Sequence, residues 1–511
     1  MRKTNLLIHC LYLFLLVISP AITRAQNDSL RLKNIEAAIP VIDKIFKDYA
    51  EKNHFPGFAY GLVVGNKLIY SGSTGIINME QKIPASSSSD FRIASMSKSF
   101  TAMSILKLRD EGKLKLDDPA WLYVPEMKGQ HYITKDATEI TIRNLLSHAA
   151  GFPEDNPWGD RQLAITGKEL KNFIKKGISF SNNPAMAYEY SNLGFNILGL
   201  IVTKVSGKPC QQYINDNILQ PLGMTHTYWE YSKVPADKLA HGYRWLNEQW
   251  IEQPMLHNGA GAPMGGMITT IEDFSKYVAL HLSAWPPKNE RESGPVNRSS
   301  IREMQHPWNV PSLNANYKYP GGRACPTVGA YAYGLRWTKD CDGRVFIAHT
   351  GGLPGFGSNW EIMPDYGIGI ISFANLTYAP AALVNRQVLD TLITLAKLKP
   401  RQLPVSTILN QRKNELISLL PEWKNAGSTG IFAENFFMDY FPDSLRKEAT
   451  LIYADAGKIL RVRELNAENN LRGSFILEGE KKDIEISFTL TPENPPLIQE
   501  YHIREKDKTP L

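Results

Sequence analysis

Short segments in which apolar and polar residues alternate predict β-strands in this chain, because successive side chains of a strand point to opposite faces. Residues 58–71 (FAYGLVVGNKLIYS) form two largely apolar runs on either side of Gly65-Asn66, which predicts a β-hairpin. Apolar runs at 345–348 and 367–374 predict two later strands, and residues 483–490 alternate near the C-terminus. The pattern indicates an antiparallel sheet.

Apolar residues at helical spacing predict four helices besides these strands. The segments 95–111 and 192–206 each carry an apolar side and are each followed by a glycine, a residue that commonly ends a helix. Thr270-Ile-Glu-Asp273 resembles a capping box that opens a helix reaching Leu282, and 410–424 is amphipathic. The fold class we expect is α/β with mixed α+β character, an antiparallel sheet flanked by helices plus a helical subdomain.

Two stretches of loop composition divide the chain. Residues 285–300 are polar and rich in proline, which indicates a surface excursion inside a domain. Residues 397–404 (Lys-Leu-Lys-Pro-Arg-Gln-Leu-Pro) separate two parts of different composition. We therefore expect one large domain over 26–398 and a small C-terminal α+β module over 405–511.

The first residues have the composition of a signal peptide. Arg2 and Lys3 precede an apolar run over 6–19, and small residues follow at Thr23 and Ala25. The run is shorter than the roughly 20 apolar residues of a transmembrane helix. We predict a signal peptide over 1–25, export to the periplasm or the outside of the cell, and no membrane span after its removal, with a retained anchor as the alternative.

Charge excludes one class of partner. Removing residues 1–25 takes away three basic residues and no acidic one, so the formal net charge falls from +6 to +3. The remaining sequence contains no dense block of lysine and arginine, and we expect no nucleic-acid binding.

The cysteines and histidines predict no metal site. Cys210, Cys325 and Cys341 remain after the signal peptide, and an odd number argues against a disulfide framework. Cys325 and Cys341 flank a predicted hairpin and are either bridged or free. Because no HExxH or CxxC spacing occurs, we expect neither a metal nor another cofactor.

Ser95-Met-Ser-Lys98 is the first candidate for chemistry. It stands at the predicted start of a helix, where residues at i and i+3 share one face. A serine hydroxyl becomes a good nucleophile when a neighbouring base takes its proton. The motif alone is weak, because Ser104-x-x-Lys107 and Ser444-x-x-Lys447 match it too, and a serine at a helix start is also an ordinary cap.

Two further segments single out Ser95. Tyr190-Ser-Asn192 precedes a predicted helix, and His349-Thr-Gly351-Gly352 follows a predicted strand. With Ser95-x-x-Lys98 they resemble, in order, the three active-site motifs of the serine β-lactamases and penicillin-binding proteins. The resemblance covers about residues 40–395 and is strongest to the class C branch, in four segments: 141–153, 190–224, 265–273 and 349–356.

The resemblance implies the β-lactamase/transpeptidase-like fold and a serine-hydrolase mechanism. Ser95 would attack a carbonyl and form an acyl-enzyme, and Lys98 would accept its proton. Tyr190 would pass a proton to the leaving group and help to activate the water that removes the acyl group. The backbone N–H groups of Ser95 and Gly352 would form the oxyanion hole.

The resemblance also implies the residues that bind substrate. Asn192 would bind a substrate amide, and Thr350 and Gly351 would line the strand along which the substrate lies. His349 stands where many β-lactamases have lysine, so a permanent cation for a substrate carboxylate is missing at this position. Alone, Tyr190 also fits a core aromatic, Asn192 a helix N-cap, and His349 a hydrogen-bonding residue of the strand.

These features predict a serine hydrolase acting on a peptide, amide or ester. The histidine favours a D-amino-acid peptidase, a carboxypeptidase or an esterase over a dedicated β-lactamase. The expected partner is a small molecule or a peptide, and one derived from the cell wall is a candidate. The alternative is a catalytically silent, penicillin-binding-like binder or sensor whose C-terminal module engages a partner.

Overall fold

The computed structural model describes residues 29–508, and the predicted signal peptide lies outside them. These residues form two compact units. Of the described residues, the larger comprises 29–285 and 289–400, and the smaller comprises 286–288 and the residues from Arg401 on. Within the described residues, none of the helices combines the length and the apolar character needed to span a bilayer.

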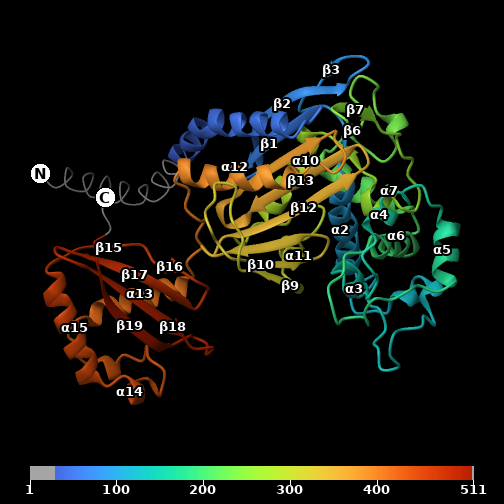
Figure 1. Ribbon diagram of the computed structural model, residues 1–511. Coiled ribbons are helices and arrows are strands. Elements are labelled where there is room, and N and C mark those ends of the chain that lie inside the picture. The colour runs from blue at the N-terminus through green and yellow to red at the C-terminus, as the bar shows by residue number, and fades with distance from the viewer. Residues whose placement is uncertain (1–28, 509–511) are drawn as a thin grey trace, which may run out of the picture. The chain divides into compact units, whose positions relative to one another are not determined.

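A nine-stranded antiparallel sheet forms the centre of the larger unit (Figure 1). In spatial order its strands are β3 (Ile83–Pro84), β2 (Lys67–Asn78), β1 (Gly57–Val64), β14 (Ile368–Ala374), β13 (Phe356–Met363), β12 (Val345–Leu353), β11 (Arg336–Asp340), β10 (Thr327–Tyr331) and β9 (Asn309–Asn314).

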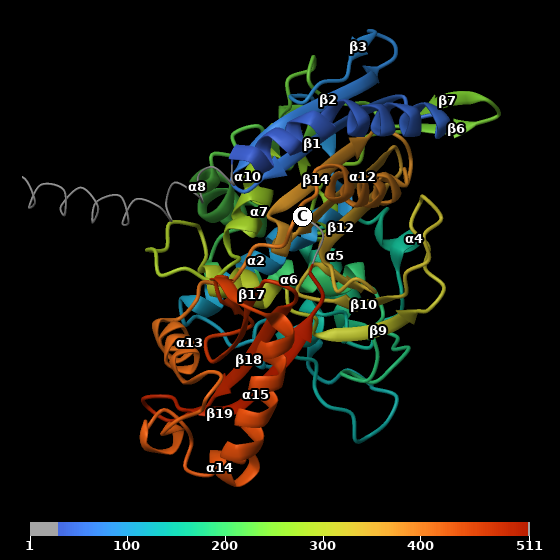
Figure 2. The same cartoon turned by 90° about the vertical axis from the view of Figure 1, so that its left-hand side faces the viewer.

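Alternation along β1 fills two hydrophobic cores, one on each face of the sheet. Phe58 and Tyr60 belong to the core beneath the helix of residues 29–52 and α12 (Ala381–Leu395). Ala59 and Val63 belong to the core shared with α10 (Ile271–Ser283) and α2 (Ser97–Asp110). Figure 2 shows the helix of residues 29–52 and α12 on the same side of the sheet.

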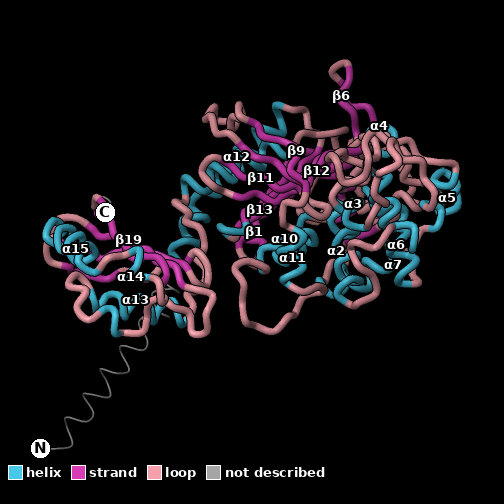
Figure 3. Tube along the Cα trace, turned by 90° about the horizontal axis from the view of Figure 1, so that it is seen from below, coloured by secondary structure: helices cyan, strands magenta, loops and turns pink. Residues whose placement is uncertain are grey.

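A helical part adjoins one end of the sheet, as Figure 3 shows for α3, α5, α6 and α7. Its helices are α3 (Ile142–Leu146), α4 (Asn156–Gly159), α5 (Gly167–Lys175), α6 (Asn192–Ser206), α7 (Cys210–Ile214), α8 (Gln220–Leu222) and α9 (Ala262–Gly265). Short strands β4 (Phe91–Arg92), β5 (Thr227–Tyr228) and β8 (Ile268–Thr269) connect it to the sheet. Helix α11 (Arg298–Met304) and the hairpin β6 (Tyr243–Leu246) and β7 (Gln249–Glu252) complete the unit.

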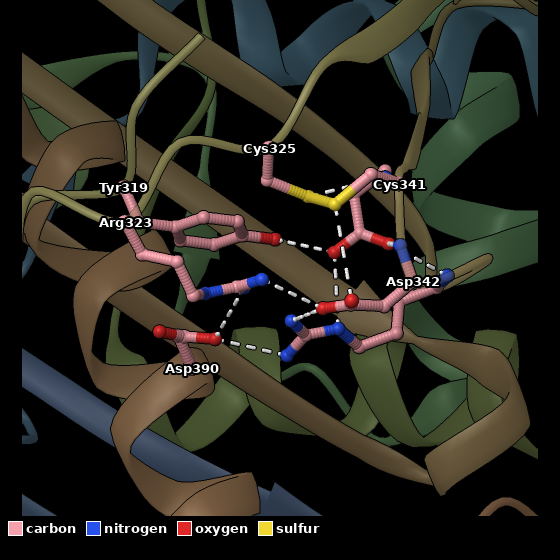
Figure 4. The surroundings of a disulfide bond; sticks show 8 residues. Tyr319, Arg323, Cys325, Cys341, Asp342 and Asp390 are labelled. Atoms are coloured by element: carbon pink, nitrogen blue, oxygen red, sulfur yellow. Dashed lines mark hydrogen bonds and ion pairs between the residues drawn. A yellow bond between two sulfur atoms is a disulfide. The ribbon is translucent and has the colours of Figure 1, made fainter.

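Cys325 and Cys341 are bridged, with Cα atoms 5.3 Å apart, and the bond closes the β10–β11 hairpin at its open end. Charged side chains surround it (Figure 4). Arg323 and Arg344 both donate to Asp390, at 3.2 and 2.9 Å. Covalent and ionic contacts therefore hold the base of this hairpin.

The smaller unit has its own core and mixes helices with an antiparallel sheet. Phe475, Ile486 and Tyr501 are among its buried residues. The helices are α13 (Thr407–Leu419), α14 (Phe436–Asp439) and α15 (Pro442–Ala456), and the strands are β15 (Ile459–Val462), β16 (Asn466–Ala467), β17 (Arg472–Gly479), β18 (Asp483–Leu490) and β19 (Ile498–Lys506).

Most predicted elements are present, and four differ in extent. The hairpin predicted over 58–71 extends to Asn78, at the end of β2. The helix predicted over 410–424 ends at Leu419, because Pro421 cannot continue it. The strand predicted over 345–348 continues to Leu353, through the glycines of the third motif. The helix predicted from Ser95 begins as a 3₁₀ turn over Ala94–Met96 and becomes an α-helix at Ser97.

Candidate active site

Ser95 lies in the 3₁₀ turn that precedes α2 and is 8% exposed. The preceding residue, Ala94, has a left-handed backbone with φ 49°, a conformation that costs roughly 1–3 kcal/mol in a non-glycine residue. Ser97 holds this turn, because its hydroxyl donates to the Ala94 carbonyl at 2.7 Å and accepts the Met267 N–H at 3.1 Å. The second serine of the motif thus shapes the turn that presents the first.

Lys98 is fully buried beneath Ser95. Its Nζ donates to Ser95 Oγ at 3.0 Å, to Asn192 Oδ1 at 2.6 Å and to the Met264 carbonyl at 2.7 Å. Burial lowers the pKa of Lys98 to about 7, although the nearby carboxylates of Asp160 and Asp155 favour its charged form. Burial therefore makes the neutral amine accessible beside Ser95 near neutral pH.

The other two matches to Ser-x-x-Lys have no such pairing. Ser104 lies inside α2, where its hydroxyl donates to the Phe100 carbonyl at 2.9 Å. Ser444 is an exposed residue of α15 in the smaller unit. Only Ser95, among the three, has its hydroxyl hydrogen-bonded to the lysine of its motif in the described part of the chain.

Tyr190 and Asn192 flank the start of α6. Ser191 is the N-cap, and its hydroxyl accepts the Gly194 N–H at 3.3 Å, so the alternative that made Asn192 the cap is wrong. Asp155 accepts the Asn192 N–H at 2.6 Å, and His148 Nδ1 accepts the Ser191 N–H at 3.1 Å. These contacts orient the Asn192 amide toward Lys98.

The ring of Tyr190 packs beside the lysine, with Lys98 Nζ 5.0 Å from the ring centroid. Burial raises the pKa of Tyr190 above its usual range, and a hydrogen bond with Ser95 offsets only part of this effect. Tyr190 therefore keeps its phenolic proton at neutral pH. It is equipped to donate a proton near Ser95 rather than to act as a phenolate base.

His349 is buried in β12 and neutral. Burial moves its pKa well below the usual range, and the charges of Arg336 and Lys98 act in the same direction. Its Nδ1 lies 2.6 Å from the Thr350 carbonyl, which only accepts, so the ring proton is on Nδ1. Nε2 then accepts the Tyr331 hydroxyl at 3.0 Å.

The end of β12 forms an open edge beside Ser95. Strand β11 pairs with β12 only as far as Ala348, so no described strand pairs with residues 349–353 on that side. Gly351 allows the close approach of β12 to the nucleophile turn, since a Cβ there would lie 2.1 Å from the Ile93 carbonyl oxygen. Gly352, whose N–H the family resemblance assigns to the oxyanion hole, follows Gly351 on the same strand.

The sequence matches the beta-lactamase family over residues 42–393. This chain belongs to the beta-lactamase family. The match concerns the family as a whole, and the narrower resemblance to its class C branch stays a prediction.

Curated relatives agree with this assignment. Protein flp of Staphylococcus aureus (strain N315) is 30% identical over 399 residues, which cover 77% of this chain and 72% of flp. Beta-lactamase-like protein 2 of Dictyostelium discoideum is 31% identical over 269 residues, 51% of this chain and 48% of the relative.

Solved structures share the fold. The octameric penicillin-binding protein homologue from Pyrococcus abyssi superposes with a TM-score of 0.58 at 21% identity, covering 89% of this chain and 91% of the homologue. The penicillin-binding protein from Bacillus halodurans gives a TM-score of 0.53 at 23% identity, covering 68% of this chain and 98% of the Bacillus protein. These two likenesses concern the fold alone.

Within this beta-lactamase-family site, Arg336 was missed by the sequence analysis. It begins β11 opposite Ala348, and its guanidinium carbon lies 5.7 Å from the centroid of the Tyr190 ring. The residue is exposed, donates a hydrogen bond to the Tyr188 side chain and forms no ion pair with any carboxylate of residues 29–508. The signal that could have found it is the register of the hairpin formed by β11 and β12, in which Arg336 pairs with Ala348, the residue before His349.

No group of metal ligands lies at the site. In the part of the chain that the structure describes, the one cluster with ligand spacing is Cys325, Cys341 and Asp342. The two sulfur atoms of this cluster are bonded to each other.

Proposed function

We propose that this chain is a serine hydrolase that cleaves an amide or ester bond through an acyl-enzyme on Ser95. The observation that carries the proposal is the 3.0 Å contact between Ser95 Oγ and the buried Lys98 Nζ. A lysine whose pKa is near the working pH is an efficient general base. Asn192 and the Met264 carbonyl can hold the neutral amine by its two protons, which leaves its lone pair directed at Ser95.

In the proposed reaction, Lys98 takes the Ser95 proton as Oγ bonds to the substrate carbonyl carbon. The N–H groups of Ser95 and Gly352 stabilise the developing oxyanion, an interaction whose loss costs about 10²–10³ in rate for one donor. Tyr190 donates its proton to the leaving group and regains one from Lys98. Water then cleaves the acyl-enzyme with the same groups acting in reverse.

Within the peptides, amides and esters, we propose a D-amino-acid peptidase or carboxypeptidase, or an esterase, rather than a dedicated β-lactamase. The neutral His349 supplies no cation. Arg336, at the open edge of β12, supplies one and has no carboxylate partner among residues 29–508, and a guanidinium binds a carboxylate with two parallel hydrogen bonds. A substrate with a free carboxylate on its leaving group fits this arrangement.

We also propose that the protein is exported. The predicted signal peptide supports this location, and so does the disulfide between Cys325 and Cys341, since disulfides persist in oxidising compartments.

The test is covalent labelling of Ser95 by a fluorophosphonate or penicillin probe, read by intact mass and peptide mapping. We expect one label per chain, its loss in Ser95→Ala, and its retention in the matched control Ser444→Ala. A hydrolysis panel of D-alanyl dipeptides, D-amino-acid amides, short-chain esters and nitrocefin then ranks substrates. A folded protein that no probe labels would overturn the proposal in favour of a silent binder.

A further inference from the structure

Asp160 is a second charged residue near the site, close enough to Lys98 to favour the charged form of its amine. Asp160 follows α4 and is 4% exposed, and its Oδ2 accepts the Tyr378 hydroxyl at 3.0 Å. The other oxygen, Oδ1, makes no hydrogen bond with any of residues 29–508, and no cation of those residues pairs with the carboxylate. Oδ1 is not one of the fully enclosed side-chain atoms that lack a hydrogen-bond partner, so solvent or a ligand can reach it.

Tyr378 connects this carboxylate to the open edge of β12. Its backbone is left-handed, with φ 52°, and its ring lies against Gly352, where an added Cβ would be 2.7 Å from Tyr378 Cδ1. Thr350, Gly352 and Tyr378 line a cavity of about 240 Å³. Asp160 therefore lies beside the Gly352 end of the strand edge.

Arg336 lies at the other end, opposite Ala348. Ala348 and Gly352 are four residues apart, or about 13 Å along an extended strand. A dipeptide laid along this edge is about 7 Å long, so its two ends would be directed toward these two side chains. The carbonyl attacked by Ser95 would then lie between the two charges.

We infer that Asp160 binds the free α-ammonium group of the residue whose carbonyl Ser95 attacks, and that Asp160 and Arg336 together select dipeptides with both chain ends free. This inference rests on the proposed hydrolase function. In the reaction, the bond from Ser95 Oγ to the carbonyl carbon forms, the amide C–N bond breaks, and the leaving amine takes a proton. Water then releases the first amino acid from the ester, so one dipeptide gives two amino acids.

The protonation state of Asp160 agrees with this role. Burial raises the pKa of Asp160 to about 6, and the positive charge of Lys98 limits the rise. A bound ammonium group would favour the ionised carboxylate in the same way as Lys98 does. An ammonium group would also replace the missing partner of Oδ1.

The experiment compares D-alanine p-nitroanilide with its N-acetyl derivative, and repeats the pair in the L series. Both substrates have the same leaving group and neither has a carboxylate, so Arg336 does not enter. We expect the wild type to prefer the free amine at least about 10-fold in kcat/KM, and Asp160→Asn to reduce that preference about 10- to 100-fold. Since Asp160 also acts on Lys98, the ratio of the two substrates is the readout, not either rate.

Tyr378→Phe is the matched control, because it removes the hydroxyl on Asp160 but keeps the negative charge. The preference for the free amine should persist in this variant. Equal rates on both substrates in the wild type, or a preference that Asp160→Asn leaves intact, would overturn the inference. Failure of fluorophosphonate to label Ser95 would instead overturn the proposed hydrolase, so the two failures are distinguishable.

Discussion

The two sides of the candidate site differ in how their polar groups are satisfied. One side, which we call the helix wall, consists of Ser95, Lys98, Tyr190 and Asn192. These side chains are buried, and Lys98 uses its three donors on three acceptors. The other side, the strand wall, consists of residues 349–353 of β12 together with Arg336. It presents an unpaired strand edge and a cation that has no carboxylate partner among residues 29–508.

The difference separates chemistry from recognition. A base needs a fixed contact and a shifted pKa, and both follow from burial among oriented partners. A substrate needs groups that are free to bind it, and the strand wall retains such groups. We therefore expect changes in the helix wall to lower turnover for every substrate, and changes in the strand wall to alter the ranking of substrates.

The largest expected effect is that of Lys98→Ala. Removing the base leaves Ser95 protonated, so kcat/KM should fall at least about 10³-fold on an ester and on a dipeptide alike. The matched control is Lys107→Ala, the lysine of the second Ser-x-x-Lys match in α2, which should change the rate by less than about threefold. The measurement is the steady-state kcat/KM of both variants on both substrates. Similar losses in both variants would contradict the assignment of Lys98.

The second prediction concerns the strand wall, where Arg336→Gln should change which substrates are preferred. It removes the cation that the proposal assigns to the substrate carboxylate, so hydrolysis of D-alanyl-D-alanine should fall about 10- to 100-fold in kcat/KM. Hydrolysis of D-alanyl-D-alaninamide, which lacks the carboxylate, should change little. Lys339→Gln, an exposed cation later on β11, is the control. A loss that is equal for the two substrates would place Arg336 in the chemistry rather than in recognition.

The pH dependence sharpens the role of the helix wall. Because Lys98 must be neutral to accept a proton and its pKa is about 7, kcat/KM should fall about tenfold per pH unit below about 7 and level off above it. An uncharged ester is the substrate to use, because the fall in kcat/KM at low pH cannot then come from ionisation of the substrate. A rate independent of pH between 5 and 7 would contradict Lys98 as the base.

The smallest expected effect concerns the start of α6. Ser191→Ala removes the N-cap of the helix that holds Asn192, and it should lower the free energy of unfolding by about 1 kcal/mol, measured by chemical denaturation. Ser191→Thr keeps an oxygen acceptor and should restore most of the loss. A value near zero for the alanine variant would mean that Asp155 alone holds this helix start.

More of the helix wall than of the strand wall could be predicted from the sequence, for a physical reason. Ser95 and Lys98 are three residues apart, so local geometry brings them together. Asn192 lies 94 residues from Lys98 and could be placed beside it only through the family resemblance. Arg336 and Asp160 belong to no short motif, because their positions depend on the register of β11 and on the path of the loop after α4.

Local signals also decided which elements were predicted well. Helix α6 and strand β18 have the predicted bounds. The residues that end the helix and the alternation along the strand are both visible in the local sequence. The end of β12 was missed, because its glycines have low strand propensity and only packing against the nucleophile turn requires them. The pairing of Cys325 with Cys341 was left open, since it depends on the register of the β10–β11 hairpin.

The unpaired edge of β12 has a consequence for how specificity evolves in this protein. A ligand that adds to a strand edge is held by its main chain, and its side chains project alternately above and below the sheet. The strand edge and its flanking charged residues then select a ligand by its chain length and terminal charge. The loops on either side of the sheet select it by its side chains. New side-chain preferences can arise by changes in those loops while the nucleophile, the base and the strand stay as they are.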